Sequence, residues 1–239
     1  MALPQSFLQH LQQSGYHPRS DKHSNALGIA IVDDLLSTCS PIAQRAAVGD
    51  LVYALNFDLH YGTAQWNVDL VLGPPPPGTG MPLGERILKA PPSTVQIALE
   101  FKAVMTEHRK AIKNRKRDME AHHEHVHNYN PQAIAGGLIL INAASTFWSP
   151  LRGTGVITTH TKIDAKVQHC MNEVRAVSVR GGPTGYGLDA KTAIVVDMDN
   201  VTPATTAYVS KTPAPQIGDP LHYDAFIQRL CSEYRTRFP

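Results

Sequence analysis

Regular alternation of residue character between Asp50 and His60 is the feature that most limits how this chain can fold. Apolar and aromatic side chains occupy every second position from Leu51 to Leu59. A repeat of two residues is typical of a strand that buries one face. Tyr61 to Thr63 supplies a turn, and strand character resumes from Trp66 to Gly73. The two segments are therefore predicted to form a hairpin.

The segments that follow the hairpin indicate a strand, a helix and a strand. Val95 to Ala103 is rich in apolar residues and is predicted to be a third strand, after a Pro/Gly-rich connection from Gly73 to Ser93. A connection of this length is usually functional or mobile. Met105 to Asn128 contains no Gly or Pro and is densely charged, which predicts one long helix. Gly137 to Ala143 is wholly apolar and is predicted to be a buried strand.

The two ends of the chain carry shorter predicted elements. Helices are expected at Pro4 to Gln13, Ser24 to Cys39 and Tyr223 to Phe238, and strands at Cys170 to Arg180 and Ala193 to Asp197. Ser24 is expected to cap the second helix, and Pro41 to mark a break after it. This order predicts an α/β fold with a mixed central sheet flanked by helices and with additional C-terminal strands and a helix. We expect one domain over 1–239, with a core at about 24–143 and a sheet extension, loops and the last helix at 144–239.

Composition excludes several classes of protein. Of the 239 residues 42% are hydrophobic and the formal net charge is +2, which excludes a disordered chain. No apolar run reaches the ~18 residues of a membrane span, and the N-terminus lacks the pattern of a secretory signal. Cys39, Cys170 and Cys231 are too few and too far apart for a disulfide framework, and Cys39 is expected to be a buried thiol. We therefore expect a soluble cytoplasmic protein with no membrane partner.

Charged residues within two of the predicted strands identify the candidate site. Asp69 lies inside the second strand, and Glu100 and Lys102 lie inside the third. Residues two apart on a strand share a face, and Asp69 can meet Glu100 if the strands are neighbours. Two carboxylates on a rigid sheet form a hard-oxygen site suited to Mg²⁺, with the backbone carbonyl of Phe101 as a further ligand. A nearby lysine can hold the attacking water or stabilise charge on a phosphate.

This arrangement resembles the D…(D/E)-x-K signature of the PD-(D/E)XK nuclease superfamily. The match consists of Asp69, a long gap and then Glu100, Phe101 and Lys102, and Val68 stands where the signature has proline. The order helix, three strands, helix, strand over about half of the chain also resembles the core of that superfamily. Within it, the chain most resembles type II restriction endonucleases. The resemblance implies a restriction-endonuclease-like fold, metal binding by Asp69 and Glu100, a catalytic role for Lys102, and Mg²⁺-dependent cleavage of double-stranded DNA. Cutting both strands of a palindrome further suggests a homodimer.

A strongly basic segment follows the site. Between Lys102 and Arg117, seven basic residues stand against one acidic residue. Arg109, Lys113 and Lys116 recur at three- and four-residue spacing and are predicted to follow one DNA strand. A solvated helix face is the alternative interpretation.

The same helix contains a literal H-E-x-x-H, the signature of zinc proteases. His123 and His127 would bind zinc and Glu124 would be the base. Four histidines in six residues generate this pattern easily, so the metalloprotease is the weaker alternative. A nucleic-acid-binding protein without catalysis is the other alternative.

Further residues are weaker candidates for metal binding or DNA contact. Asp33, Asp34 and Asp58 are possible carboxylates for a second metal, and the loops 74–93, with Arg86 and Lys89, and 181–187 are possible DNA contacts.

Overall fold

The centre of the molecule is a mixed seven-stranded sheet in the order β3-β1-β2-β4-β5-β8-β9. The structure is a computed structural model that describes residues 3–80, 84–153 and 155–239. The strands of this sheet are β1 (Val52–Tyr61), β2 (Ala64–Gly73), β3 (Leu88–Lys89), β4 (Ile97–Val104), β5 (Ile134–Asn142), β8 (Ala190–Asp197) and β9 (Ala207–Tyr208). A separate two-stranded sheet joins β6 (Thr146–Trp148) to β7 (Ile157–Thr159).

Strand direction changes across the sheet. β2 pairs antiparallel with both β1 and β4, so these three strands form a meander, while the short β3 lies parallel to β1 at the edge. β4, β5 and β8 are parallel, and the helix α4 (His108–Tyr129) makes the crossover from β4 to β5. A parallel pair needs such a crossover, and the long charged segment after β4 supplies it.

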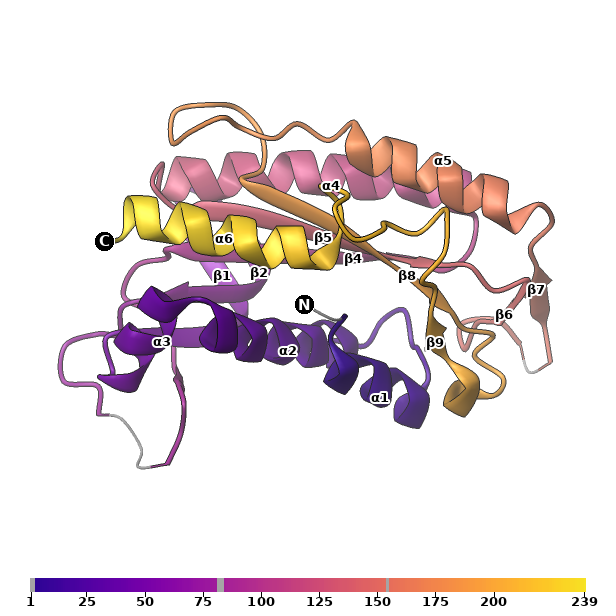
Figure 1. The fold of residues 1–239 in the computed structure, drawn as a ribbon, viewed down its shortest axis with the longest axis horizontal. Coiled ribbons are helices and arrows are strands. Elements are labelled where there is room, and N and C mark those ends of the chain that lie inside the picture. Colours follow the sequence, from indigo (N-terminus) through magenta and orange to yellow (C-terminus); the bar gives the residue numbers. More distant parts are fainter. Residues whose placement is uncertain (1–2, 81–83, 154) are drawn as a thin grey trace.

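Helices cover both faces of the sheet, as Figure 1 shows. One face packs on α1 (Gln5–Ser14), α2 (Lys22–Thr38), α3 (Ser40–Ala47) and α6 (Tyr223–Arg237), and we call this the first core. The other face packs on α4 and α5 (Ile163–Arg175), and we call this the second core. The apolar strands β5 and β8 are buried between the two cores, as expected for parallel strands covered on both faces.

Two glycines of β5 leave room for side chains that pack on its opposite faces. A Cβ on Gly136 would lie 2.4 Å from Leu99 Cδ2, and one on Gly137 would lie 2.3 Å from Met119 Sδ of α4. A side chain at either position would therefore displace the end of the neighbouring leucine or methionine side chain. The Gly-Gly pair therefore fixes how tightly β5 is enclosed.

Most predicted elements are confirmed. The hairpin, the third strand, the long charged helix, the apolar strand and the first and last helices all form, with ends displaced by a few residues. The break at Pro41 is also confirmed, since α3 begins at Ser40 directly after α2. Within the connection from Gly73 to Ser93, Leu88 and Lys89 form β3 against the start of β1, while residues 81–83 lie outside the described part of the chain.

The predicted strand from Cys170 to Arg180 is wrong. Its first half belongs to the helix α5, whose buried residues are Val167, Cys170, Met171 and Val174. These positions recur at helical spacing, and the β-branched residues further along concealed that period. Arg180 follows as part of a loop in which Val179 forms one bridge with Leu188.

The capping role predicted for Ser24 is also wrong. α2 begins at Lys22 and Asp21 is its N-cap residue. Ser24 lies inside the first turn, where its hydroxyl donates to the backbone carbonyl of Asp21 at 3.1 Å.

The expectation that Cys39 is a free thiol is corrected by a disulfide between Cys39 and Cys231. Cys39 lies at the junction of α2 and α3, and Cys231 lies on α6. The two helical segments are 192 residues apart in sequence and adjacent in the first core, so spacing alone did not reveal the pair. Cys170 is a free, buried thiol.

Within the described ranges, no single helix has the length and apolar character needed to cross a membrane. Only the bent pair of α2 and α3 meets those criteria together, on length and composition alone.

Candidate active site

The candidate site lies where β2 and β4 separate. Their backbone pairing runs from Leu72↔Ile97 to Leu70↔Leu99 and is not continued at Asp69 and Glu100. Asp69 Oδ2 instead accepts the Phe101 N–H at 2.7 Å. A side chain thus satisfies a backbone donor that a continuing ladder would have used. The gap between the two strands places a carboxylate beside β4.

Glu100 and Lys102 form an ion pair on β4. Lys102 Nζ donates to Glu100 Oε1, and the Glu100 side chain is only 4% exposed whereas that of Lys102 is 26% exposed. The strand period therefore puts both side chains on one face, as the sequence predicts. Lys102 reaches toward solvent, and Glu100 lies behind it.

The second oxygen of Glu100 faces a buried histidine on α4. Glu100 Oε2 lies 3.7 Å from His122 Nδ1, and neither atom has a hydrogen-bond partner in the described part of the chain. His122 Nε2 lies 3.2 Å from the Ala98 carbonyl, which can only accept, so Nε2 carries the proton. Nδ1 then presents a lone pair to Glu100, and the carboxylate keeps one oxygen unsatisfied.

Burial perturbs all three charged groups. It raises the pKa of Glu100 to about 7, and the nearby Asp69 charge adds to this effect while Lys102 opposes it. Burial also raises the pKa of Asp69, although the Phe101 N–H and Lys102 oppose it. For Lys102, burial lowers the pKa, but the carboxylates of Glu100 and Asp69 outweigh it and the net direction is upward. The site therefore holds a charged lysine beside two carboxyl groups whose charged forms are disfavoured by burial.

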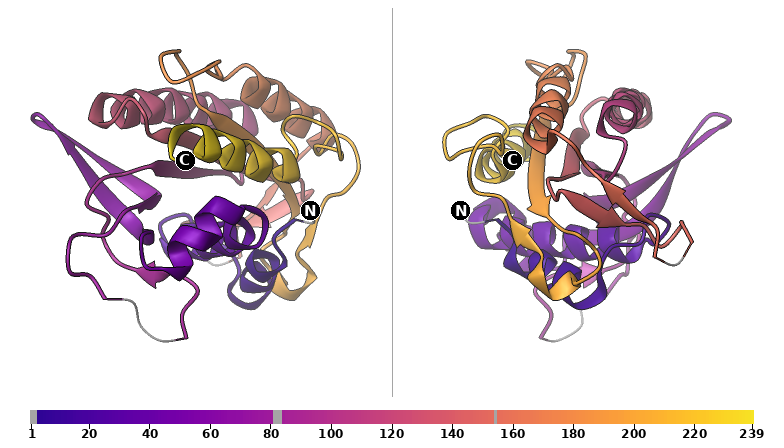
Figure 2. Two further views of the ribbon diagram at one scale, coloured as in Figure 1. Left: turned by 60° about the vertical axis from the view of Figure 1, so that its left-hand side comes forward. Right: turned by 90° about the vertical axis from the view of Figure 1, so that its right-hand side faces the viewer.

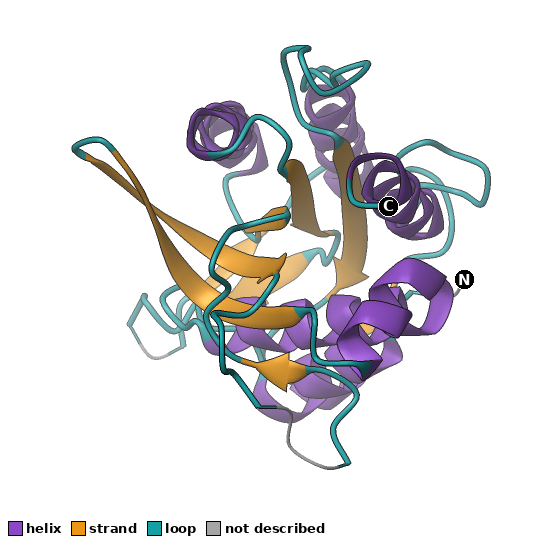
Figure 3. Ribbon diagram, turned by 90° about the vertical axis from the view of Figure 1, so that its left-hand side faces the viewer, coloured by secondary structure: helices purple, strands orange, loops and turns teal. Residues whose placement is uncertain are grey.

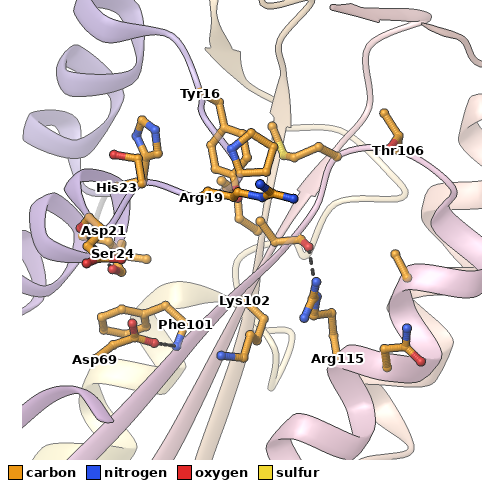
Figure 4. Close-up of a pocket in the computed structure, with 18 of the residues that line it drawn as sticks. Tyr16, Arg19, Asp21, His23, Ser24, Asp69, Phe101, Lys102, Thr106 and Arg115 are labelled. Carbon is orange, nitrogen blue, oxygen red and sulfur yellow. Dashed lines mark hydrogen bonds between the residues drawn. The ribbon is translucent and has the colours of Figure 1, made fainter. Parts of the chain in front are cut away.

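A cleft of about 530 Å³ opens onto Asp69 and Lys102. Its floor is formed by Asp69, Phe101 and Lys102, as Figure 4 shows. One wall is the segment from Tyr16 to Ser24 at the start of α2, and the opposite wall is the first half of α4. Burial raises the pKa of Tyr16 to about 12, and its hydroxyl is within electrostatic reach of both Arg115 and Asp69. Tyr16 therefore stays a neutral donor inside the cleft.

The face of α4 that lines the cleft differs from the one predicted to bind DNA. Lys110, Asn114 and Arg115 line the cleft. Arg109 and Lys113 are exposed outside that lining, and Lys116 pairs with Glu173 of α5 at 3.7 Å. The predicted stripe therefore follows the helix on its α5 side. Spacing along the sequence identified a common face, but not which face meets the site.

The other candidate carboxylates lie away from the cleft. Asp34 accepts from Tyr223 Oη at 2.6 Å, Asp33 lies 3.9 Å from Arg86, and Asp58 accepts from Asn67 Nδ2 at 2.8 Å. Asp21, which the sequence did not single out, lines the cleft. The described residues of the two loops proposed for DNA contact also lie outside the cleft lining. In these loops Arg86 bonds Ser37 and Tyr186 bonds Glu124.

The ring centroids of His123 and His127 in the H-E-x-x-H sequence lie 5.8 Å apart, and each histidine also has a partner of its own. His127 Nε2 lies 3.3 Å from Asp189 Oδ2, His123 packs edge-on against Tyr186, and Glu124 accepts from the Tyr186 hydroxyl. Asp189 in turn binds the guanidinium groups of Arg180 and Arg237. These contacts tie the end of α4 to the start of β8 and to the end of α6.

The donor set fits Mg²⁺ in type and number. Within residues 3–80, 84–153 and 155–239, no three His, Cys, Asp or Glu side chains are grouped to hold a metal. Mg²⁺ is commonly held by only one or two carboxylates, with water and substrate phosphate completing the shell. Asp69 and Glu100 supply such oxygens, and Glu100 Oε2 lacks a hydrogen-bond partner among the described residues. The role of the Phe101 carbonyl stays a prediction.

The cleft contains residues that the sequence did not single out, although Lys110 and Arg115 belong to the basic segment that it identified. Tyr16, Arg19 and Ser24 come from the first wall, and Lys110, Asn114 and Arg115 come from α4. Lys110 and Asn114 are four apart, which puts them on one side of the helix. The spacing of the buried residues Ile112, Met119 and Val126 could have shown which side of this helix faces the sheet, and therefore which side is left for the cleft.

Comparison of the chain with protein-family models, with curated proteins and with solved structures found no match.

Proposed function

We propose that the protein is a Mg²⁺-dependent endonuclease that hydrolyses phosphodiester bonds of double-stranded DNA, in the manner of a type II restriction enzyme. The observation that carries the proposal is the separation of β2 and β4 beyond the pair Leu70↔Leu99, which we call the fork. There Asp69 and Lys102 line the floor of a cleft, and the buried Glu100 is paired with Lys102. The meander β1-β2-β4 followed by the crossover helix α4 and the parallel strand β5 supports a restriction-endonuclease-like core.

Each residue has a defined part in the proposed reaction. Asp69 and Glu100 would hold the cation, which when bound would polarise a phosphoryl oxygen and acidify a water. Lys102 stays charged, because its pKa is raised, and would therefore orient the attacking water or stabilise charge on the phosphate rather than accept a proton. Water adds to phosphorus as one ester P–O bond breaks, which leaves a phosphate monoester and a hydroxyl.

Three substitutions test the assignment: Asp69→Asn, Glu100→Gln and Lys102→Met. Each is expected to lower Mg²⁺-dependent cleavage of plasmid and phage DNA by at least about 100-fold, because each removes charge that acts on the transition state. Asp197→Asn is the matched control, since Asp197 is an exposed carboxylate on β8, another strand of the same sheet, and does not line the cleft. Duplex binding without Mg²⁺ should persist in all four variants.

Two results would contradict the proposal. One is wild-type cleavage rates in the Asp69 and Glu100 variants. The other is duplex binding without cleavage by the unaltered protein in either Mg²⁺ or Mn²⁺, which would favour a binding protein. The plasmid product also tests the proposed homodimer, because two equivalent sites linearise supercoiled DNA whereas one site nicks it.

A further inference from the structure

The hairpin of β1 and β2 extends past the fork as a two-stranded ribbon with one exposed polar face. Figures 2 and 3 show it projecting from the body of the sheet. The polar face consists of Asn56, Asp58, His60, Gln65 and Asn67, all exposed. Asp58 is paired with Asn67 across the strands, and His60 with Gln65. Asn56 and Asp69 lie at the interruption of this pairing, between the pairs Leu55↔Leu70 and Phe57↔Val68. The polar face therefore begins at the candidate site.

The reverse face holds the ribbon in place. Leu59 and Val68 are buried in the second core, and Trp66 stacks on His125 of α4 with ring centroids 4.5 Å apart. Leu55, which lies before the fork, packs against the first core, whereas Phe57, which lies beyond it, packs against the second core. The change of side occurs at Asn56, whose φ of 52° lies in the left-handed region. This turn of the backbone directs the polar face outward beyond the fork.

Hydrogen bonds within the polar face preorganise its side chains. Asp58 Oδ1 accepts from Asn67 Nδ2 at 2.8 Å, and Gln65 also donates to this carboxylate. Each amide group carries two N–H donors and one carbonyl oxygen. The bond to Asp58 uses one donor of each amide, so a donor and an acceptor remain on each for a ligand.

Two contacts place the ribbon beside the cleft. His125 lies eleven residues beyond Asn114, about three helical turns, so both are on one side of α4. Asn114 lines the cleft, and His125 stacks on Trp66 of the ribbon. On the opposite wall, Asn56 Nδ2 bonds Asn25 Oδ1 at 3.0 Å, and Asn25 follows Ser24, another cleft residue.

We propose that this polar face enters the major groove of duplex DNA and reads base edges, setting the sequence preference of the nuclease. The inference rests on the proposed function. A two-stranded β-ribbon fits the major groove of B-DNA, where Asn and Gln bind adenine and Asp accepts from cytosine. The segment 56–67 contains no Lys or Arg, so it suits bases rather than phosphates, while Lys110 and Arg115 face the cleft to contact the backbone. The deep, narrow major groove of RNA would not admit the ribbon.

The test compares Gln65→Ala and Asn67→Ala with the unaltered protein. Phage DNA is digested with Mg²⁺ and the ends are sequenced, and bound duplexes are selected from a randomised pool without Mg²⁺. Each variant is expected to lose discrimination at one or two base positions by about 5- to 150-fold, as for the loss of one bidentate contact. Gln168→Ala, an exposed glutamine on α5, is the matched control and should keep the original preference.

Three results overturn the inference. They are an unchanged preference in both hairpin variants, an equal change in the Gln168 control, and an unaltered protein that shows no sequence preference in either assay. The binding selection needs no cleavage. A sequence preference that depends on Gln65 and Asn67 in a protein that never cleaves would therefore sustain base reading while the proposed catalysis fails.

Discussion

The basic residues of α4 divide into two groups with different surroundings. Lys110 and Arg115 face the cleft, whereas Arg109 and Lys113 are exposed outside it. A phosphate backbone that reaches Lys102 passes the first group and not the second. Position relative to the cleft, rather than the number of charges, should therefore decide which residues contribute to DNA affinity.

We predict that Lys110→Ala and Arg115→Ala weaken duplex binding more than Arg109→Ala and Lys113→Ala. Each lost phosphate contact should also reduce the slope of log K against log salt by about 1. Fluorescence anisotropy over a range of salt concentrations, without Mg²⁺, measures both quantities. Equal losses in the two pairs would show that the helix attracts DNA only through its overall charge.

Asp189 is the centre of a buried charge network. Burial raises its pKa, but bonds from His127, Arg237, Arg180 and the Ala135 N–H outweigh this, so the net direction is strongly downward. A carboxyl whose folded pKa lies below its unfolded value stabilises the folded state above the unfolded pKa, about 3.9. That contribution is lost as the pH falls through the folded pKa.

We predict that the free energy of unfolding decreases with acidification below about pH 4, in part through Asp189. Asp189→Asn should cost about 3 to 5 kcal/mol at pH 7, because it leaves Arg180 and Arg237 buried without their counter-charge. It should also reduce the acid dependence. Urea unfolding at several pH values measures both effects. A variant with the wild-type acid dependence would contradict the role given to Asp189.

Among the elements, α6 is joined covalently to the junction of α2 and α3 by Cys39 and Cys231. It also packs Phe226, Ile227 and Leu230 into the first core. A cross-link over so long a loop restricts the unfolded chain and stabilises the folded one.

We predict that reduction with dithiothreitol, or the double change Cys39→Ser and Cys231→Ser, lowers the free energy of unfolding by about 3 to 5 kcal/mol. The double variant should then be insensitive to dithiothreitol, which makes it the internal control for effects on Cys170. Denaturant titrations with and without reductant provide the measurement. The same midpoint for oxidised and reduced wild-type protein would argue against the cross-link.

The sequence predicts an element well when the spacing of its apolar residues can be recognised within that element alone. The hairpin and β4 were predictable because alternation is local, and α4 because an uninterrupted charged run admits no turn. α5 was missed because Val174, Val177 and Val179 favour a strand locally, while packing of Val167 and Met171 against α4 requires a helix. The disulfide was missed because no local pattern reports a contact across 192 residues.

On the scale of the whole molecule, the candidate site was predictable in its floor and not in its walls. The strand period fixes Glu100 and Lys102 on one face, and neighbouring strands bring Asp69 to them. The walls are the segment from Tyr16 to Ser24 and the first half of α4, which pack on opposite faces of the sheet and meet across the cleft. The sequence shows neither that these two segments meet nor which side of α4 faces the cleft.

The bond between Cys39 and Cys231 also makes the chain between them a closed covalent ring. Every strand of both sheets lies within that ring, as do α3, α4 and α5. A single backbone cut anywhere in it, for example between β6 and β7, would open the ring without releasing a fragment. The nicked protein would keep its mass and separate into two pieces only after reduction.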